Sequence, residues 1–333
     1  MKRRIELLET TLRDGSYTID FRFTAEDTRR IAAKLEKAGF DLIELGHGIG
    51  LNATKTVQPA AATDEEYLQA AHESLKRATW CMFCIPGFAT IDHVELAAKR
   101  GMPFIRIGTN ITEYEKAEPF VKRAKELGMR VSLNLMKSYV VSLSEFIRIA
   151  KIVEGYGSDV VVLVDSAGNM LPEDVAQYIR AMRKELRCKI GFHGHDNLGL
   201  ANGNTLVAVE EGADIIDTSL RGIGRSSGNA QTETMLLLLK RRGYDLNIDV
   251  KQAMAIGEEE IAPLVREARG ASPVDAICGY AGFHSSYLPI VEKAAKERGV
   301  DLLDLILEVC TINRVRVTNA VVAEAIERIK GRA

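Results

Sequence analysis

Eight short apolar runs recur along the first two thirds of the chain, and they limit the fold more than any other feature. Several runs, such as 81–85 and 160–164, are continuous rather than alternating, which is typical of strands buried on both faces and hence of a parallel sheet. The stretches between the runs are amphipathic and predict helices. Two of these begin with a threonine followed three residues later by an acid, at Thr24 and Thr63, which is the capping-box signature of a helix start. The runs are residues 5–8, 42–45, 81–85, 104–107, 131–135, 160–164, 190–192 and 215–216.

Eight strand–helix units in roughly 240 residues predict a (β/α)8 TIM barrel. A doubly wound open sheet is the alternative, and it is less favoured because no GxGxxG sequence follows the first run. From about residue 249 the pattern is helical, without convincing strands. We therefore expect a TIM-barrel catalytic domain over residues 1–245 and a C-terminal helical domain over residues 246–333.

Composition and charge argue against several classes of function. The 333 residues are 46% hydrophobic and carry a formal net charge of −2 without a basic patch, so we expect a globular protein that does not bind nucleic acid. No apolar stretch approaches the ~20 residues of a membrane helix, and no signal-peptide pattern is present, so a cytoplasmic location is expected. Five scattered cysteines suit a reducing compartment. Cys81 and Cys84 form a CxxC, which we interpret as packing in a buried strand rather than a redox or zinc site.

The polar residues that follow the predicted strands point to a metal site, because catalytic residues of a barrel gather at the C-terminal ends of its strands. His193 and His195 follow the seventh run, and residues two apart in an extended segment point to the same side. Asp14 follows the first run, which neighbours the eighth in a closed barrel. One carboxylate and two imidazoles leave positions open on a divalent ion, which suits a Lewis acid that binds substrate oxygens. We expect the three residues in loops beyond the strands, so that their substitution weakens metal binding without unfolding the barrel.

Arg13 precedes Asp14 directly. Its planar guanidinium is suited to an enolate or a carboxylate, and we expect it to bind that part of a substrate. The alternative is a surface ion pair between Arg13 and Asp14 at a turn.

Three segments resemble, in their order along the chain, the hallmarks of the DRE-TIM metallolyase (HMG-CoA lyase-like) superfamily. They are residues 10–15 (TTLRDG), 191–198 (GFHGHDNL) and 222–229 (GIGRSSGN). Three more segments are similar to its 4-hydroxy-2-oxovalerate aldolase branch, namely residues 43–51 (IELGHGIGL), 165–172 (DSAGNMLP) and 279–286 (GYAGFHSS). The similarity runs essentially from end to end, including the helical C-terminal region.

This resemblance implies a set of site residues and a cofactor. It implies Asp14, His193 and His195 as ligands of a divalent metal, with Mn²⁺ or Mg²⁺ favoured and Zn²⁺ as an alternative. It also implies that Arg13 and the region of Ser166 hold the pyruvyl or enolate part of the substrate. Asn229 is expected to orient the metal ligands. Whether this asparagine coordinates the metal directly differs among branches of the superfamily.

The activity implied is that of a metal-dependent aldolase, a C–C lyase that cleaves or forms a 4-hydroxy-2-oxo acid with pyruvate and an aldehyde. Aldolases of this branch associate with an acylating aldehyde dehydrogenase, so such a partner and a homo-oligomer are expected. A Claisen-type acyltransferase that condenses acetyl-CoA with a 2-oxo acid is the alternative enzyme, because it uses the same metal site. A non-catalytic partner subunit is the third hypothesis.

Two positions depart from the aldolase pattern. Tyr17 stands where the aldolases have a catalytic histidine, and His284 corresponds to their active-site tyrosine. Because imidazole is the better base near neutral pH and a phenol the better hydrogen-bond donor, the exchange predicts His284 as the base and Tyr17 as the group that orients substrate. The alternative is that both merely fill space.

Overall fold

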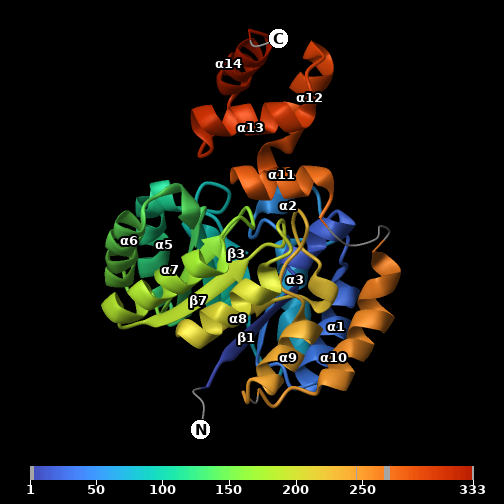
Figure 1. The fold of residues 1–333 in the computed structure, drawn as a ribbon. Helices are drawn as coiled ribbons and strands as arrows, with labels where there is room; N and C mark the ends of the chain where they lie inside the picture. Colours follow the sequence, from blue (N-terminus) through green and yellow to red (C-terminus); the bar gives the residue numbers. More distant parts are fainter. Residues whose placement is uncertain (1–3, 245, 266–270, 332–333) are drawn as a thin grey trace.

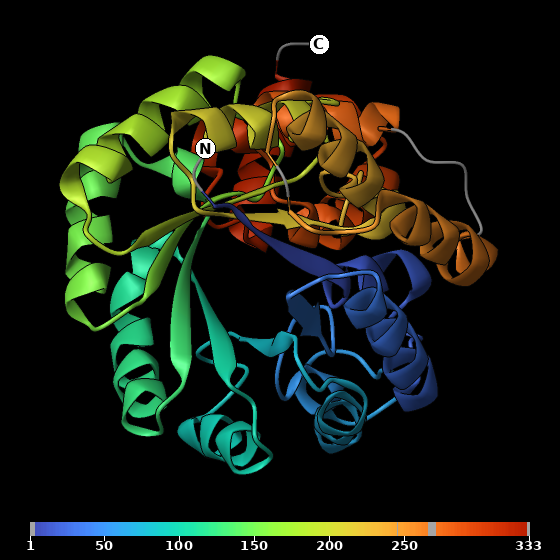
Figure 2. The same cartoon turned by 90° about the horizontal axis from the view of Figure 1, so that it is seen from below.

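The computed structural model describes residues 4–244, 246–265 and 271–331, and it shows a closed barrel of eight parallel strands (Figures 1 and 2). Neighbouring strands pair in sequence order, and β1 pairs with β8 from Glu6 opposite Ile215 to Glu9 opposite Thr218. This pairing closes the sheet, so the TIM barrel is confirmed and the open doubly wound sheet is excluded. The strands are β1 (Glu6–Leu12), β2 (Leu42–Leu45), β3 (Thr79–Cys84), β4 (Phe104–Asn110), β5 (Arg130–Met136), β6 (Val160–Asp165), β7 (Lys189–Gly194) and β8 (Ile215–Thr218).

Helices surround the barrel as an outer ring, which is plain in the view along the strands (Figure 2). The capping boxes expected at Thr24 and Thr63 are both formed. The α-helices of this ring and its loops are α1 (Ala25–Lys37), α2 (Ala53–Thr56), α3 (Asp64–Ser74), α4 (Ile91–Lys99), α5 (Glu118–Glu126), α6 (Leu143–Gly155), α7 (Pro172–Glu185), α8 (Ala201–Glu211), α9 (Thr232–Arg241) and α10 (Val250–Ile256). Short 3-10 turns are η1 (Asp14–Ile19), η2 (Ile111–Ala117), η3 (Ser138–Val140), η4 (Leu220–Gly222) and η6 (Ala262–Leu264), and η5 (Gly257–Ile261) is a π-helical turn.

The interior of the barrel changes from apolar to charged along the strands. Residues two apart on a strand point to the same side, so three strands each place an apolar side chain low in the interior and a charged one above it. These pairs are Leu42 and Glu44 on β2, Phe104 and Arg106 on β4, and Ile215 and Asp217 on β8. The charged layer therefore lies toward the C-terminal ends of the strands, beneath the expected active site.

Cys81 and Cys84 are both buried on β3, and all five cysteines are free. Cys81 packs with the barrel interior, whereas Cys84 packs with the core between strands and helices. The packing interpretation of the CxxC is confirmed, because side chains on opposite faces of a strand cannot bind one ion or form a disulfide together.

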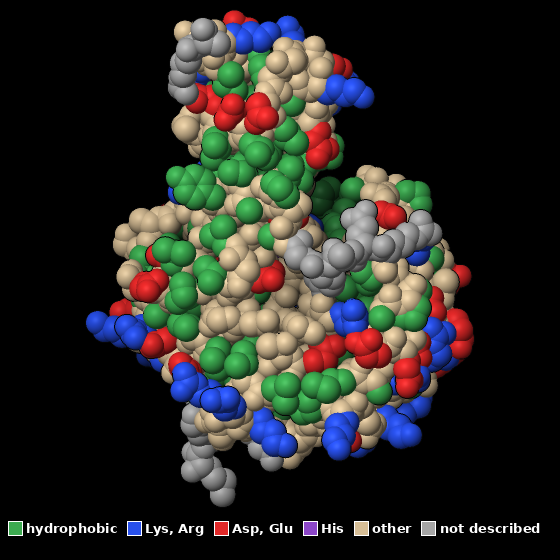
Figure 3. Space-filling model, turned by 45° about the vertical axis from the view of Figure 1, so that its right-hand side comes forward, with side chains coloured by type: hydrophobic (Ala, Val, Ile, Leu, Met, Phe, Trp, Pro, Cys, Tyr) green, Lys and Arg blue, Asp and Glu red, His purple; other side chains and the backbone are tan. Residues whose placement is uncertain are grey.

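The C-terminal helices form a lobe above the barrel (Figure 1). They are α11 (Pro273–Ala281), η7 (Ser285–Tyr287), α12 (Leu288–Arg298), α13 (Leu302–Asn313) and α14 (Asn319–Lys330), and they share a separate hydrophobic core. Asp275 of α11 accepts hydrogen bonds from Asn197 and Ser226 in the loops after β7 and β8, so the lobe covers the C-terminal rim of the barrel. Hydrophobic side chains gather where the lobe rises from the barrel (Figure 3).

The position of the domain boundary after residue 245 stays a prediction. Just beyond it, Ala253 and Ile256 of α10 pack into the core of the barrel. Among the described residues, no helix is both long and apolar enough to cross a membrane.

Candidate active site

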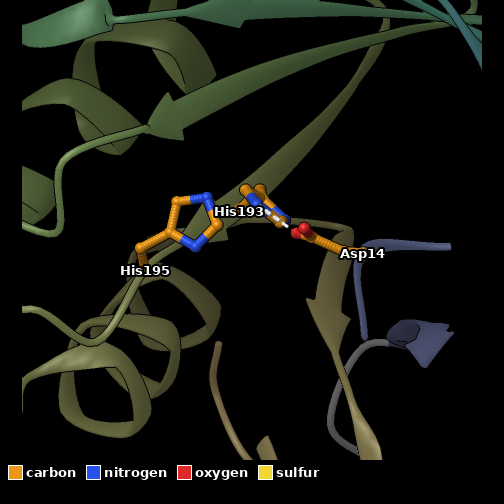
Figure 4. A group of neighbouring side chains, drawn as sticks. All are labelled: Asp14, His193 and His195. Atoms are coloured by element: carbon orange, nitrogen blue, oxygen red, sulfur yellow. Dashed lines mark ion pairs between the residues drawn. The ribbon is translucent and has the colours of Figure 1, made fainter. Parts of the chain in front are cut away.

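Asp14, His193 and His195 meet at the C-terminal mouth of the barrel (Figure 4). One potential ligand atom from each lies within 4.8 Å of those of the other two, and all three residues are buried. Asp14 opens η1 directly after β1, and His193 lies on β7 with His195 just past its end. The extended backbone of β7 brings the two imidazoles to one side, as the spacing of the histidines predicts.

The expectation that the three residues lie in loops beyond the strands was wrong for His193, which lies on β7, and all three residues are buried. β1 extends to Leu12 and β7 to Gly194, four and two residues further than the apolar runs indicate, and Asp14 and His193 are only 1% and 6% exposed. β1 continues beyond its apolar run through the polar residues 9–11, which are buried because they find hydrogen-bond partners within the protein. Removal of either histidine side chain therefore leaves a buried cavity, and some loss of stability is expected along with the loss of metal.

Four alternating charges lie directly beneath this group. Arg13 donates from Nε to Glu44 Oε2 at 2.7 Å, and Arg106 donates from Nη1 to the same oxygen at 2.8 Å. The other end of the Arg106 guanidinium binds Asp217. Arg13 also donates to Gly48 O at 3.3 Å and lies 4.8 Å from the centre of the Phe83 ring, so its orientation is fixed on several sides.

The same network orients His193. Its Nδ1 lies 3.0 Å from Asp217 Oδ2, a contact that places the Nδ1 proton between them and leaves the lone pair on Nε2. Nε2 in turn faces Asp14 Oδ2 at 3.3 Å. His195 is oriented separately, since its Nδ1 contacts the Gly228 carbonyl at 3.2 Å. Both histidines thus present Nε2 to the centre of the group.

The electrostatic surroundings favour ligand-competent forms of Asp14 and His195. Burial opposes ionisation of Asp14, but the neighbouring Arg13 and the histidines hold the pKa of its carboxyl well below the usual range. Burial and the charge of Arg225 hold the pKa of His195 well below its usual value, so its imidazole is neutral. For His193, hydrogen bonds to Asp14 and Asp217 outweigh burial and raise the pKa, so a proton competes there with a cation.

Unsatisfied buried atoms test whether these residues fit a divalent metal. Asp14 Oδ2 and Asn229 Oδ1 are buried without a hydrogen-bond partner in the described structure. Asn229 pairs with His195 through the backbone, which keeps it beside the group. Buried oxygens are rarely left unpaired, and a carboxylate with two imidazoles is a common donor set for a divalent transition metal. The site therefore fits such an ion.

Ser166 lies at the end of β6, 3% exposed, between the metal-ligand candidates and the lobe. Its Oγ accepts the Lys137 backbone N–H at 2.9 Å, and its carbonyl accepts from Arg225 Nη2 at 2.7 Å. The Ser166 hydroxyl can therefore still donate a hydrogen bond to a substrate.

The structure brings Tyr17 and His284 to the same mouth from opposite sides. The charges of Arg225, Asp14 and Arg13 all act on Tyr17, and burial raises its pKa to about 12. His284 is the N-cap of η7, and its Nδ1 lies 2.7 Å from Ser286 Oγ. Nδ1 also accepts the Ser286 backbone N–H and a guanidinium N–H of Arg225, both at 3.3 Å. Burial, Arg225 and Lys137 hold the pKa of His284 well below its usual value.

Four residues of the site have no role assigned from the sequence. They are Lys137 and Arg225, near Ser166, and Arg106 and Asp217, in the charged layer. Arg106 interrupts the apolar run 104–107, and a charge inside a buried strand is a usable signal for a barrel-interior network. Asp217 follows the shortest run, so only the true end of β8 reveals that it faces inward.

Comparisons with known proteins agree with this geometry. The HMGL-like family model matches residues 4–259. The 4-hydroxy-2-oxovalerate aldolase of Carboxydothermus hydrogenoformans is 39% identical over 316 residues, which cover 95% of this chain and 94% of that protein. The enzyme of the same name from Geobacillus thermodenitrificans is 40% identical over 308 residues, covering 92% and 90%.

Among solved structures, the carboxyl transferase domain (Y628A) of Rhizobium etli pyruvate carboxylase with pyruvate superposes with a TM-score of 0.81. It is 18% identical, and the match covers 99% of this chain and 62% of that one. At this identity the likeness concerns the fold alone, and it extends through the helical lobe.

Proposed function

Since the chain belongs to the HMGL-like family, we propose that it is a divalent-metal-dependent aldolase that cleaves, or forms, a 4-hydroxy-2-oxo acid with pyruvate and an aldehyde as products. The observation that carries the proposal is the buried group of Asp14, His193 and His195 with Arg13 beside it. Relatives named 4-hydroxy-2-oxovalerate aldolase, which match over 95% and 92% of the chain, support the same reaction.

Asp14 Oδ2 and the Nε2 atoms of His193 and His195 would hold the ion, for which we propose Mn²⁺ or Mg²⁺, with Zn²⁺ as the alternative. When bound, such an ion acts as a Lewis acid toward the 2-oxo acid and balances the negative charge of an enolate.

Arg13 and Ser166 are the residues that we assign to the pyruvyl end of the substrate. Glu44 and Gly48 hold the Arg13 guanidinium, and its remaining N–H groups are donors for a carboxylate or enolate oxygen. Ser166 is a further donor, because its oxygen accepts the Lys137 backbone N–H and its hydroxyl proton takes no part in that contact.

Cleavage requires a base for the 4-hydroxyl proton while the C3–C4 bond breaks and its electron pair passes into the enolate. The sequence-based prediction assigns this role to His284, but the surroundings of His284 favour an exchange of roles between His284 and Tyr17. The Nδ1 lone pair of His284 is engaged by two N–H groups, so the ring offers a proton at Nε2 rather than a lone pair. We assign transfer of this proton to Tyr17 and hydrogen-bond donation to His284. Tyr17 accepts a proton only when ionised; burial raises its pKa to about 12, so the assignment depends on the charges of Arg225 and Arg13, which act against that rise.

The test is cleavage of 4-hydroxy-2-oxopentanoate by purified protein that has been freed of metal and then supplied with Mn²⁺. Pyruvate and acetaldehyde in equal amounts are expected only when Mn²⁺ is present. Release of free CoA from acetyl-CoA and a 2-oxo acid, with no aldol cleavage, would instead establish the acyltransferase alternative. Failure to bind any divalent ion would favour the non-catalytic subunit.

We also propose a cytoplasmic location, a homo-oligomer and an acylating aldehyde dehydrogenase as partner, which removes a reactive aldehyde. The similarity to the aldolase relatives supports these three proposals. Light scattering of the purified chain, alone and mixed with such a dehydrogenase, measures both forms of assembly.

A further inference from the structure

Arg225 reaches across the mouth of the barrel from the loop after β8. Its Nη2 donates to the Ser166 carbonyl at 2.7 Å and its Nη1 to Ser285 Oγ at 2.9 Å. These partners are neutral, and the ion pairs found among the described residues do not include Arg225. The side chain is therefore fixed in place with its positive charge uncompensated.

Lys137 places a second cation at the same mouth. It follows β5 with left-handed backbone geometry (φ 57°), which is strained for a side chain of this kind and is found most often at functional sites. The residue is 3% exposed, and its Nζ donates to Tyr287 Oη and the Val315 carbonyl, both at 3.1 Å. Burial and the charge of Arg225 lower the pKa of Lys137 to about 8.

Among the described residues, no carboxylate forms an ion pair with either of these two cations. Glu113 acts on Lys137 only weakly, and it is already paired with Lys116. In the layer below, by contrast, Arg13 faces Glu44 and Arg106 faces Asp217. Lys137 is buried and Arg225 is partly buried, and a cation withdrawn from water without a counter-ion is costly unless a ligand supplies the missing charge.

The position of Arg225 shows which part of a substrate would supply that charge. Its charge lowers the pKa values of His195, Tyr17 and His284, so it stands close to all three. The metal-ligand candidates and Arg13 occupy the deep end of the site, where the 2-oxo acid would bind. Arg225 lies next to His284, with its Nη1 3.3 Å from His284 Nδ1, and its charge acts on Lys137, so both cations lie on the His284 side of the site.

We propose that the aldehyde half of the substrate carries an anionic group, a carboxylate or a phosphate, which binds Arg225 with Lys137 as the supporting charge. The guanidinium fork suits either group because both accept two parallel N–H bonds. This inference rests on the proposed aldolase function and adds the class of aldehyde to it.

The first experiment compares kcat/KM for addition of pyruvate to three aldehydes in the presence of Mn²⁺: succinic semialdehyde, glyceraldehyde 3-phosphate and the uncharged butanal. The wild type is expected to prefer one of the anionic aldehydes, and the identity of the better one distinguishes carboxylate from phosphate. Arg225→Gln should reduce the preference over butanal about 10- to 100-fold, the scale of one lost charge-assisted hydrogen bond. Arg225→Lys should keep part of it, and Arg180→Gln, a surface control paired with Glu211 on α8, should keep all of it.

The preference is a ratio, so a general loss of activity in a variant does not alter it. A wild type that prefers butanal, or an Arg225→Gln variant with an unchanged ratio, would overturn the inference while leaving the aldolase function intact. Absence of any aldol product would refute the proposed function instead.

A binding measurement tests the anion site without turnover. 2-Oxoadipate is expected to bind at least about ten times more tightly than 2-oxohexanoate by calorimetry, and Arg225→Gln should close the gap. Equal affinities in the wild type would overturn the inference whatever reaction the protein catalyses.

Discussion

Asp217→Asn tests whether the charged layer prepares the metal site. In the wild type, Asp217 Oδ2 accepts from both His193 Nδ1, at 3.0 Å, and Arg106. An asparagine has one acceptor oxygen and no charge. In either orientation of the amide, Arg106 keeps Glu44 as its one charged partner. If the NH2 group faces His193, it also selects the tautomer with the proton on Nε2, where the ion should bind.

The size of the effect follows from this geometry. Loss of the outer partner of a metal-binding histidine costs about 10- to 100-fold in metal affinity, or about 1.4 to 2.8 kcal/mol. The upper half of that range is expected because Asp217 is 2% exposed and water cannot replace it.

The pH dependence of metal affinity should also differ between the wild type and the variant, in a direction that the structure predicts. Asp14 and Asp217 raise the pKa of His193, so in the wild type a proton displaces the ion as the pH falls through that raised value. The variant keeps only Asp14, and its affinity should fall at a lower pH. The loss of Mn²⁺ affinity in the variant, relative to the wild type, should therefore be largest at about pH 8 and smaller at about pH 6.

Calorimetric titration with Mn²⁺ at both pH values measures the effect, with circular dichroism to verify the fold. Asp214→Asn is the matched control, because Asp214 pairs with Arg183 at the opposite end of the barrel. An unchanged Mn²⁺ affinity of a folded Asp217→Asn protein at about pH 8 would refute the orienting role of Asp217.

Substitutions at four further positions test the chemistry and the packing of the site. Arg13→Lys should keep the fold and the ion but lose about 10²- to 10³-fold in kcat, because an ammonium lacks the fixed fork; near wild-type turnover would make Arg13 a structural residue. Tyr17→Phe should lose about 10²- to 10⁴-fold in kcat. The kcat of His284→Gln should stay well above that of His284→Ala, because glutamine retains a hydrogen-bond donor. A larger loss of kcat at His284 than at Tyr17 would restore His284 as the base. Gly168→Ala should lower the unfolding free energy by about 1–3 kcal/mol and weaken Mn²⁺ binding, since its Cβ would lie 2.6 Å from the His195 carbonyl at φ +59°; normal thermal stability and binding would contradict this.

The barrel was predictable because its signal is local. Each of the eight apolar runs corresponds to one strand, and the amphipathic stretches between them, two of them opened by Thr24 and Thr63, form the helices. The ends of the strands were less visible, as β1 shows. Three of its last four residues, Glu9 to Thr11, are polar, and they are buried with hydrogen-bond partners, as Glu9 accepts from Thr11 and Leu220.

The candidate site was predictable only in part for the same reason. Asp14, His193 and His195 lie in short motifs that carry their own signal, and the structure brings them together. Arg225, by contrast, acts across 59 residues on Ser166 and 60 on Ser285, and only the closed barrel with its lobe shows that the three meet. The state of His284 likewise depends on a neighbour from a distant loop.

Anomalous diffraction from crystals of the protein grown with Mn²⁺ tests the central claim most directly. The arrangement of Asp14 Oδ2 and the two Nε2 atoms predicts one anomalous peak per chain, bonded to all three and leaving positions open toward Arg13. A peak bonded to other residues, or none at this group under saturating Mn²⁺, would contradict the metal site and the mechanism built on it.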